Sequence, residues 1–222
     1  MQVAGFTRSF VIDQGTVLGM DQLFAALFNK PLTDPKRDGI CTGLSMIWLA
    51  RLMLMHNETP KQRQDALHSV GGYRWGGKSQ DIHLGAGGAG NVDSDATWKS
   101  HYDAALKAYV LTIVGNSTVG FGCADVKGTA KAFAPSAIVK HTYRLWNVGL
   151  RTNTGNAGHM VASYASGGTL GLNRHLYFFD PNMGEYKVDT GDAAKFVEAW
   201  LTAYGTTFVG LNYLASFAVR RG

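Results

Sequence analysis

The chain has 222 residues, of which 45% are hydrophobic, 11% aromatic and 17% charged, values that exclude a disordered chain and allow a single folded domain, residues 1–222. The formal net charge is +5, but lysine and arginine are scattered and form no basic stripe interleaved with aromatic residues. That pattern argues against nucleic acid as a partner and gives no support to a membrane surface.

The first half of the chain is predicted to be mainly helical. The expected helices cover about residues 20–28, 41–55, 60–68 and 97–110, and a short strand at 10–12 precedes them. Apolar residues occupy most of the circumference of the helix that begins at Cys41, which predicts a central, buried helix. The glycine-rich stretch 71–95 is predicted to be irregular. No apolar run reaches the ~18 residues of a membrane span.

The second half is predicted to be antiparallel β structure with one late helix. The expected strands cover about residues 136–148, 158–165, 175–180, 185–188 and 211–219, and the expected helix covers 192–204. Helices first and antiparallel strands later indicate an α+β fold rather than a doubly wound sheet.

Cys41 follows a polar turn and begins the buried helix. A helix N-terminus carries unsatisfied N–H groups and a partial positive charge, and both favour a thiolate. The same N–H groups can stabilise the oxyanion that forms when a carbonyl is attacked. Taken by position alone, Cys41 reads rather as a small apolar residue packed under a helix start.

His159 and Asp180 lie on two strands that are expected to form a hairpin. With its centre between Thr169 and Leu170, the hairpin pairs His159 directly with Asp180 and brings their Cβ atoms about 5 Å apart. Asp180 is expected at a strand end near the surface, holding the Nδ1–H of His159 and favouring imidazolium beside a thiolate. Alone, His159 reads as a structural histidine and Asp180 as a turn residue.

Several other signals do not indicate a site. The glycines between Gly85 and Gly90 match G-x-G-x-x-G, but no apolar helix follows, so a surface loop is expected instead of a dinucleotide site. No histidine stands at metal-ligand spacing with Cys123 or with another histidine, and no metal or cofactor is predicted. His175 is the rival catalytic histidine, but it begins the partner strand away from Asp180. Cys123 is expected to be structural.

Three segments resemble the YopT/AvrPphB-type papain-like cysteine proteases, which are bacterial effectors. These segments are Asp38-Gly39-Ile40-Cys41-Thr42-Gly43-Leu44-Ser45 with Trp48-Leu49, Gly158-His159 with Val161-Ala162, and Phe178-Phe179-Asp180-Pro181-Asn182 with Gly184-Glu185-Tyr186. The resemblance implies a papain-like fold, a Cys41-His159-Asp180 triad and hydrolysis of a protein or peptide amide in the cytoplasm of a target cell.

That assignment leaves several points open. Glutamine deamidation or acyl transfer would use the same triad, and a non-catalytic binding module would keep the same fold. Papain-like enzymes usually place Asn or Gln shortly before the cysteine as an oxyanion donor, whereas Lys36, Arg37 and Asp38 stand here. Residues 1–10 lack the pattern of a cleavable signal peptide, so export without one is expected. The two cysteines need no disulfide in a chain of this size.

Overall fold

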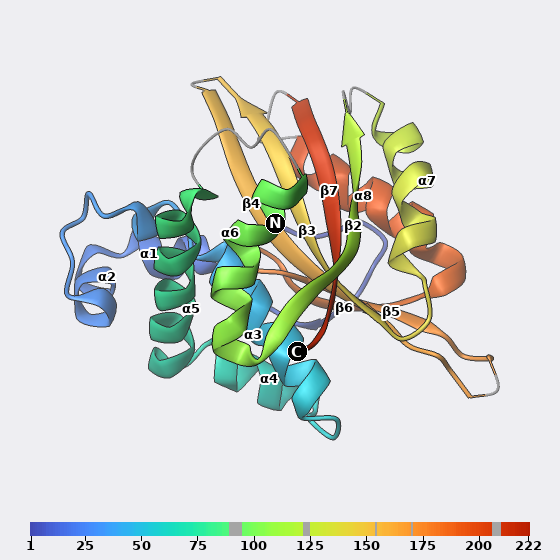
Figure 1. Ribbon diagram of the computed structural model, residues 1–222, viewed down its shortest axis with the longest axis horizontal. Coiled ribbons are helices and arrows are strands. Elements are labelled where there is room, and N and C mark those ends of the chain that lie inside the picture. The colour runs from blue at the N-terminus through green and yellow to red at the C-terminus, as the bar shows by residue number, and fades with distance from the viewer. Residues whose placement is uncertain (89–94, 122–124, 154, 170, 206–209) are drawn as a thin grey trace.

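The strands of the computed structural model, which describes residues 1–88, 95–121, 125–153, 155–169, 171–205 and 210–222, form an antiparallel sheet with the order β1-β6-β5-β4-β3-β7-β2 (Figure 1). Its strands are β1 Arg8–Phe10, β2 Leu111–Phe121, β3 Thr142–Thr152, β4 Gly155–Ala165, β5 His175–Asp180, β6 Gly184–Asp189 and β7 Gly210–Arg221. The α-helices are α1 Gln14–Gly19, α2 Asp21–Phe28, α3 Cys41–Leu54, α4 Pro60–Leu67, α5 Val70–His83, α6 Asp95–Leu106, α7 Val126–Ala137 and α8 Ala193–Gly205.

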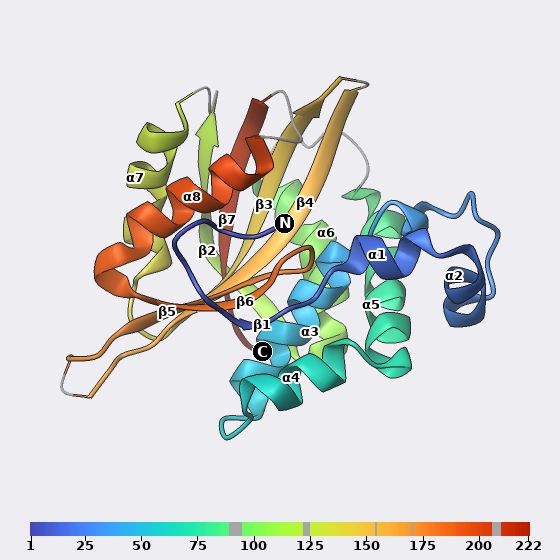
Figure 2. The same ribbon diagram turned by 180° about the vertical axis from the view of Figure 1, so that it is seen from behind.

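Helices cover both faces of the sheet. Figures 1 and 2 show α3 and α6 against one face, with α5 packed beside them, and α7 and α8 against the other. Side chains of a strand alternate between faces, so β4 contributes Met160 and Ala162 to the core around α3 and Val161 to the core around α8. Burial on both faces explains why the middle of β4 is a continuous apolar run instead of an alternating one.

Helix α3 lies at the centre of the first core, as its apolar circumference predicts. Its first ten residues, Cys41 to Ala50, are all buried. Trp48 stacks on Phe179 of β5, with ring centroids 5.6 Å apart and an interplanar angle of 12°. Because α3 is anchored on the sheet in this way, the start of the helix is fixed relative to the strands.

The prediction that residues 71–95 are irregular is wrong for the part that the structure describes. Ser69 caps α5 by accepting a hydrogen bond from the Gly72 N–H, and the helix continues to His83 before a π-helical turn, Leu84–Gly88. The glycines allow close packing rather than turns: a Cβ on Gly43 of α3 would lie 2.0 Å from the carbonyl oxygen of Gly76. Glycine therefore marks a close helix–helix crossing here, at some cost in helix propensity.

Gly43→Ala is expected to destabilise the protein by roughly 1–3 kcal/mol, because the added methyl group forces the backbones of α3 and α5 apart. The free energy of unfolding in urea measures the effect. Gly71→Ala is the matched control, since its Cβ would meet only Ser69 Oγ at 3.6 Å. That change is expected to stabilise the helix by roughly 0.5–1 kcal/mol. Equal stability of the two variants would contradict the packing argument.

Other differences from the predicted elements are local. Strand β2 and helices α1 and α7 are additional, and the strand expected from residue 136 begins at Thr142 because Ser136 and Ala137 end α7. Pro135 lies inside that helix. Because proline usually breaks a helix, the sequence gives no sign that the helix continues through it. Strand β1 covers residues 8–10 instead of 10–12. None of the described helices has the length and apolar character needed to cross a bilayer.

Candidate active site

Cys41 is the first residue of α3, and two glutamines bind the N–H groups on either side of it. The Ile40 N–H donates to Gln14 Oε1 at 2.9 Å, and the Thr42 N–H donates to Gln80 Oε1 at 3.2 Å. Among the described residues, none accepts from the backbone N–H of Cys41 itself. The helix start thus presents one unused donor beside the thiol.

The thiol meets the sheet where β4 and β5 diverge. Their pairing ends at Ala162 opposite Phe179, which leaves the backbone groups of Met160 without a β5 partner. Helix α3 supplies both partners, because the Cys41 thiol accepts from the Met160 N–H and Ser45 Oγ donates to the Met160 carbonyl at 3.0 Å. Cys41 and Ser45 are four residues apart and so lie on one side of the helix. This docking places the thiol next to His159.

His159 and Asp180 are in contact, although the predicted register between their strands is wrong by two residues. β4 and β5 pair Ala165 with Leu176 and Ala162 with Phe179, so His159 lies diagonally across from Asp180 instead of directly opposite. A shift of two residues preserves the face on which each side chain lies, because side chains alternate with a period of two. A histidine ring is long enough to span the diagonal.

The histidine ring is oriented differently from the prediction. His159 Nε2, not Nδ1, lies 3.0 Å from Asp180 Oδ1, and the ring also forms a hydrogen bond with the Cys41 thiol. With Nε2 bound to the carboxylate, Nδ1 is the nitrogen left to face the sulfur. Thiol, imidazole and carboxylate therefore form one continuous hydrogen-bonded chain.

Asp180 is fully buried, with an exposed fraction of 0%, and not near the surface as its strand-end position predicts. Four donors converge on its carboxylate. Oδ1 accepts from His159 and from the Asn182 N–H at 2.8 Å, and Oδ2 accepts from Trp200 Nε1 and Tyr204 Oη, each at 2.8 Å. Tyr204 Oη also lies 2.9 Å from His159 Nε2. Complete hydrogen bonding is what makes burial of this charge tolerable.

Trp200 and Tyr204 belong to the site but were not among the predicted residues. They are four residues apart on α8, so both side chains point from one side of that helix toward Asp180. The apolar periodicity of α8 predicts that Trp200 and Tyr204 are buried, but it does not predict what they contact. Two aromatic residues with polar tips on a buried stripe need hydrogen-bond partners, and a buried carboxylate is a suitable one.

The titration of the three groups is coupled. Burial by itself would raise the pKa of the Cys41 thiol, but the hydrogen bond and charge of His159 and the N–H groups of Met160 and Thr42 outweigh it and lower that pKa. Burial would likewise lower the pKa of His159, but Asp180 and Cys41 raise it to about 10. His159 and the donors from Trp200 and Asn182 outweigh burial and lower the pKa of Asp180. These directions favour a thiolate–imidazolium pair at neutral pH.

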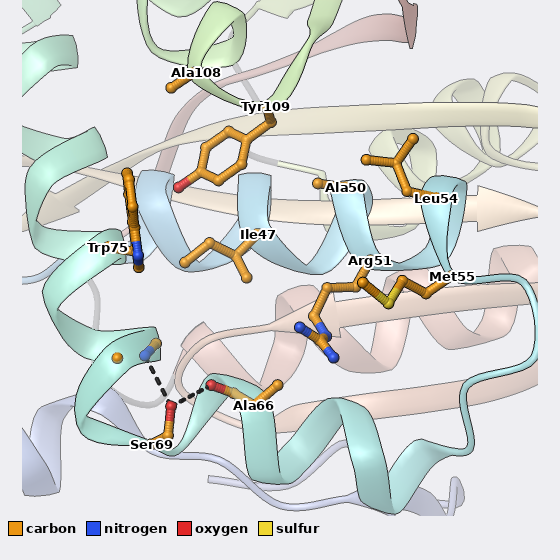
Figure 3. A pocket seen from close by; sticks show the side chains of 12 residues that line it. Ile47, Ala50, Arg51, Leu54, Met55, Ala66, Ser69, Trp75, Ala108 and Tyr109 are labelled. Atoms are coloured by element: carbon orange, nitrogen blue, oxygen red, sulfur yellow. Dashed lines mark hydrogen bonds between the residues drawn. The ribbon is translucent and has the colours of Figure 1, made fainter.

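A cavity of about 160 Å³ opens beside these residues and is lined by Cys41 and His159 together with side chains from α1 and α8. A larger cavity, about 460 Å³, lies toward the other end of α3, where Trp75 and Tyr109 flank Ile47 (Figure 3). The larger cavity is mainly apolar and none of the three predicted residues lines it. The smaller cavity is the candidate active site because a nucleophile, Cys41, and a base, His159, both line it.

The remaining sequence signals do not contribute to this site. His175 forms an ion-pair contact with Asp189 at 3.1 Å, at the far end of β5 from Asp180. The loop expected between Gly85 and Gly90 is a π-helical turn as far as Gly88, and its last residues lie outside the described part of the chain, as does Cys123. Among the described residues, no three His, Cys, Asp or Glu side chains are grouped for metal binding.

Comparison with known proteins identifies a family and two solved structures that the chain resembles. A sequence model of the Yersinia/Haemophilus virulence surface antigen family, a peptidase family, matches residues 20–208. The crystal structure of the Pseudomonas avirulence protein AvrPphB matches with a TM-score of 0.65 at 18% identity, over 83% of this chain and 93% of that chain. This likeness shows the papain-like α+β fold that the sequence resemblance implies.

A second solved structure is less similar. PatoxP, a cysteine protease-like domain of the Photorhabdus asymbiotica toxin PaTox, matches with a TM-score of 0.41 at 11% identity, over 94% of this chain and 52% of that chain. That likeness is too low to bear on the fold. No curated protein sequence matches the chain.

Proposed function

The chain belongs to the Yersinia/Haemophilus virulence surface antigen family, and from that premise we propose that it is a cysteine protease whose catalytic triad is Cys41, His159 and Asp180. The observation that carries the proposal is the unbroken contact from thiol to imidazole to carboxylate, with His159 Nε2 lying 3.0 Å from Asp180 Oδ1. Each group has the partner that its role requires, since a base must reach the nucleophile and an acid must orient the base.

The mechanism follows from the coupled charges. The Cys41 thiolate attacks the carbonyl carbon of an amide, and the imidazolium of His159 gives its Nδ1 proton to the departing amine. Neutral His159 then takes a proton from water, which attacks the thioester and releases the acid. Asp180 stays ionised throughout and holds the ring through Nε2. No step needs a metal or an organic cofactor.

The substrate that this proposal implies is a protein of a target cell. The matching family is one of virulence antigens. The cavity that contains Cys41 is small, about 160 Å³, so a flexible segment of the substrate must enter it. Secretion into that cell is part of the proposal. The net charge of +5 favours an acidic substrate surface.

Iodoacetamide is expected to alkylate Cys41 faster than Cys123 at pH 6, because His159 and the N–H groups of Met160 and Thr42 lower the pKa of Cys41 and so raise its thiolate fraction. The pKa of Cys41 is lowered and that of His159 is raised, so the ion pair exists between the two values. The thiolate is lost only as the pH falls through the lowered pKa of Cys41, and the imidazolium is lost as the pH rises through about 10. Peptide mass spectrometry of timed labelling at several pH values measures the acid limit, because a thiolate is alkylated whether or not the histidine beside it is charged.

Asp180→Asn supplies the comparison for this experiment. Loss of the carboxylate removes the charge that raises the pKa of His159. Because the charge of His159 lowers the pKa of Cys41, labelling of Cys41 at pH 6 is expected to slow in this variant. Equal labelling of Cys41 and Cys123 at pH 6 in the unaltered chain would argue that no ion pair forms and would refute the proposal.

A further inference from the structure

Gln14, the first residue of α1, lines the same cavity as Cys41. Its side chain is 4% exposed. Its Oε1 accepts from the Ile40 N–H at 2.9 Å, and its Nε2 donates to Asn182 Oδ1 at 3.0 Å. A backbone N–H can only donate, so the bond to Ile40 fixes which end of the amide is oxygen and leaves the nitrogen on the side of Asn182, which also lines the cavity.

Gln14 and Cys41 both line this cavity, and each has an N–H group from which no described residue accepts. A primary amide has two N–H bonds, and Asn182 takes one of those on Gln14. No other described residue accepts from that nitrogen, and none accepts from the backbone N–H of Cys41. Both donors lie at the start of α3, where the partial positive charge of the helix adds to them.

None of the positions where a papain-like enzyme usually has an amide donor holds an amide side chain in this chain. Lys36 is buried, and its Nζ lies 2.7 Å from Asp81 and 2.9 Å from Asp34. Arg37 lines the cavity, but its Nη2 donates to Asp21 and to the Gly19 carbonyl, and its Nη1 is buried without a partner among the described residues, so Arg37 is the rival donor that the test must exclude. A Cβ at Gly39, where φ is +148°, would lie 3.6 Å from Gln14 Nε2. Glycine therefore keeps the space in front of the Gln14 amide open.

We propose that Gln14 Nε2–H and the Cys41 backbone N–H form the oxyanion hole of the proposed hydrolase, which makes this inference dependent on the proposed function. When the Cys41 sulfur bonds to the carbonyl carbon, the π pair of the C=O bond moves to oxygen, and these two N–H groups bind the resulting oxyanion. The same pair re-forms the C=O bond as the C–N bond breaks and the amine leaves with the proton from His159. The anchored amide is fixed before the reaction, as an oxyanion donor must be.

The test compares two reagents that attack the same thiolate, in a Cys123→Ser background. Acylation by 4-nitrophenyl acetate passes through an oxyanion, whereas alkylation by iodoacetamide does not. In Gln14→Ala the acylation rate is expected to fall on the order of 10²–10³-fold, while the alkylation rate is unchanged. The ratio of the two rates cancels any change in the fraction of thiolate.

Gln14→Glu keeps the acceptor for the Ile40 N–H but removes the Nε2 donor, so the ratio is expected to fall in this variant as well, without loss of the α1 contact. Gln64→Ala is the control, because Gln64 Nε2 donates to the Val11 carbonyl at 2.9 Å, outside the cavity. A ratio that stays at the unaltered value in both Gln14 variants, or falls in Arg37→Ala instead, would overturn the assignment. Failure of the proposed function itself would show separately, as slow alkylation of Cys41 in the unaltered chain.

Discussion

A Cys41→Ala variant is expected to lose its hydrolytic activity, by on the order of 10⁶ in turnover if the triad acts as a unit. No other group can replace the sulfur, because His159 and Asp180 are bound to each other and face the position that the thiol vacates. The fold is expected to survive, since the change removes one atom from a side chain that is 8% exposed. Circular dichroism during thermal unfolding checks that expectation.

The activity is measured without knowledge of the substrate. A target-cell extract is incubated with the unaltered chain or with Cys41→Ala, and mass spectrometry compares the peptides. New chain ends that appear only with the unaltered chain indicate proteolysis, whereas intact backbones with glutamine converted to glutamate indicate deamidation. Cys123→Ala is the control and is expected to retain activity. Activity retained in Cys41→Ala would show that the nucleophile lies elsewhere.

Glu185→Ala is expected to destabilise the protein by about 3–5 kcal/mol, the largest effect on stability among these predictions. Glu185 is fully buried on β6 and accepts two bonds from Arg63, at 2.7 and 2.8 Å, and one from Trp48 Nε1 at 2.7 Å. Its removal leaves the guanidinium of Arg63 buried with no carboxylate partner. The network joins α3, α4 and the sheet, so the loss is expected in the free energy of global unfolding.

Asp65→Ala is the matched control. Asp65 pairs with Lys61 on the surface of α4, and the two side chains are 60% and 72% exposed. Exposed pairs contribute only about 0–1 kcal/mol because water screens them. Chemical denaturation of both variants gives the comparison. Similar losses in the two would show that the buried network contributes no more than a surface ion pair.

The sequence predicts those parts of the fold that depend on local patterns. The buried helix that begins at Cys41 is confirmed because apolar residues on nearly every face have one stable environment, the middle of a core. β5 is predicted at its observed bounds, His175–Asp180. The contact of His159 with Asp180 is predicted even though the register is not. The face on which a side chain lies depends only on whether its position is odd or even along the strand, whereas the register depends on the geometry of the turn.

Features that depend on contacts between distant segments could not be predicted in the same way. The glycines of α5 indicate flexibility when read locally, and only the neighbouring helix shows that they permit close packing. Gln14, Trp200 and Tyr204 come from α1 and α8, outside the three motifs. Each reaches the site through a long side chain, and the local sequence does not determine which distant group the tip of that side chain contacts. The ring orientation of His159 also depends on both partners together.

The four donors around Asp180 restrict which residue can stand there. An asparagine would offer one oxygen and one amino group, and one of its two sides would then present hydrogens. In one orientation those hydrogens oppose the Trp200 indole N–H, and in the other they oppose the Asn182 backbone N–H, neither of which can accept. The indole N–H of Trp200 and the backbone N–H of Asn182 thus require a group that accepts hydrogen bonds at both oxygens, which is a carboxylate. The negative charge of that carboxylate is what raises the pKa of His159.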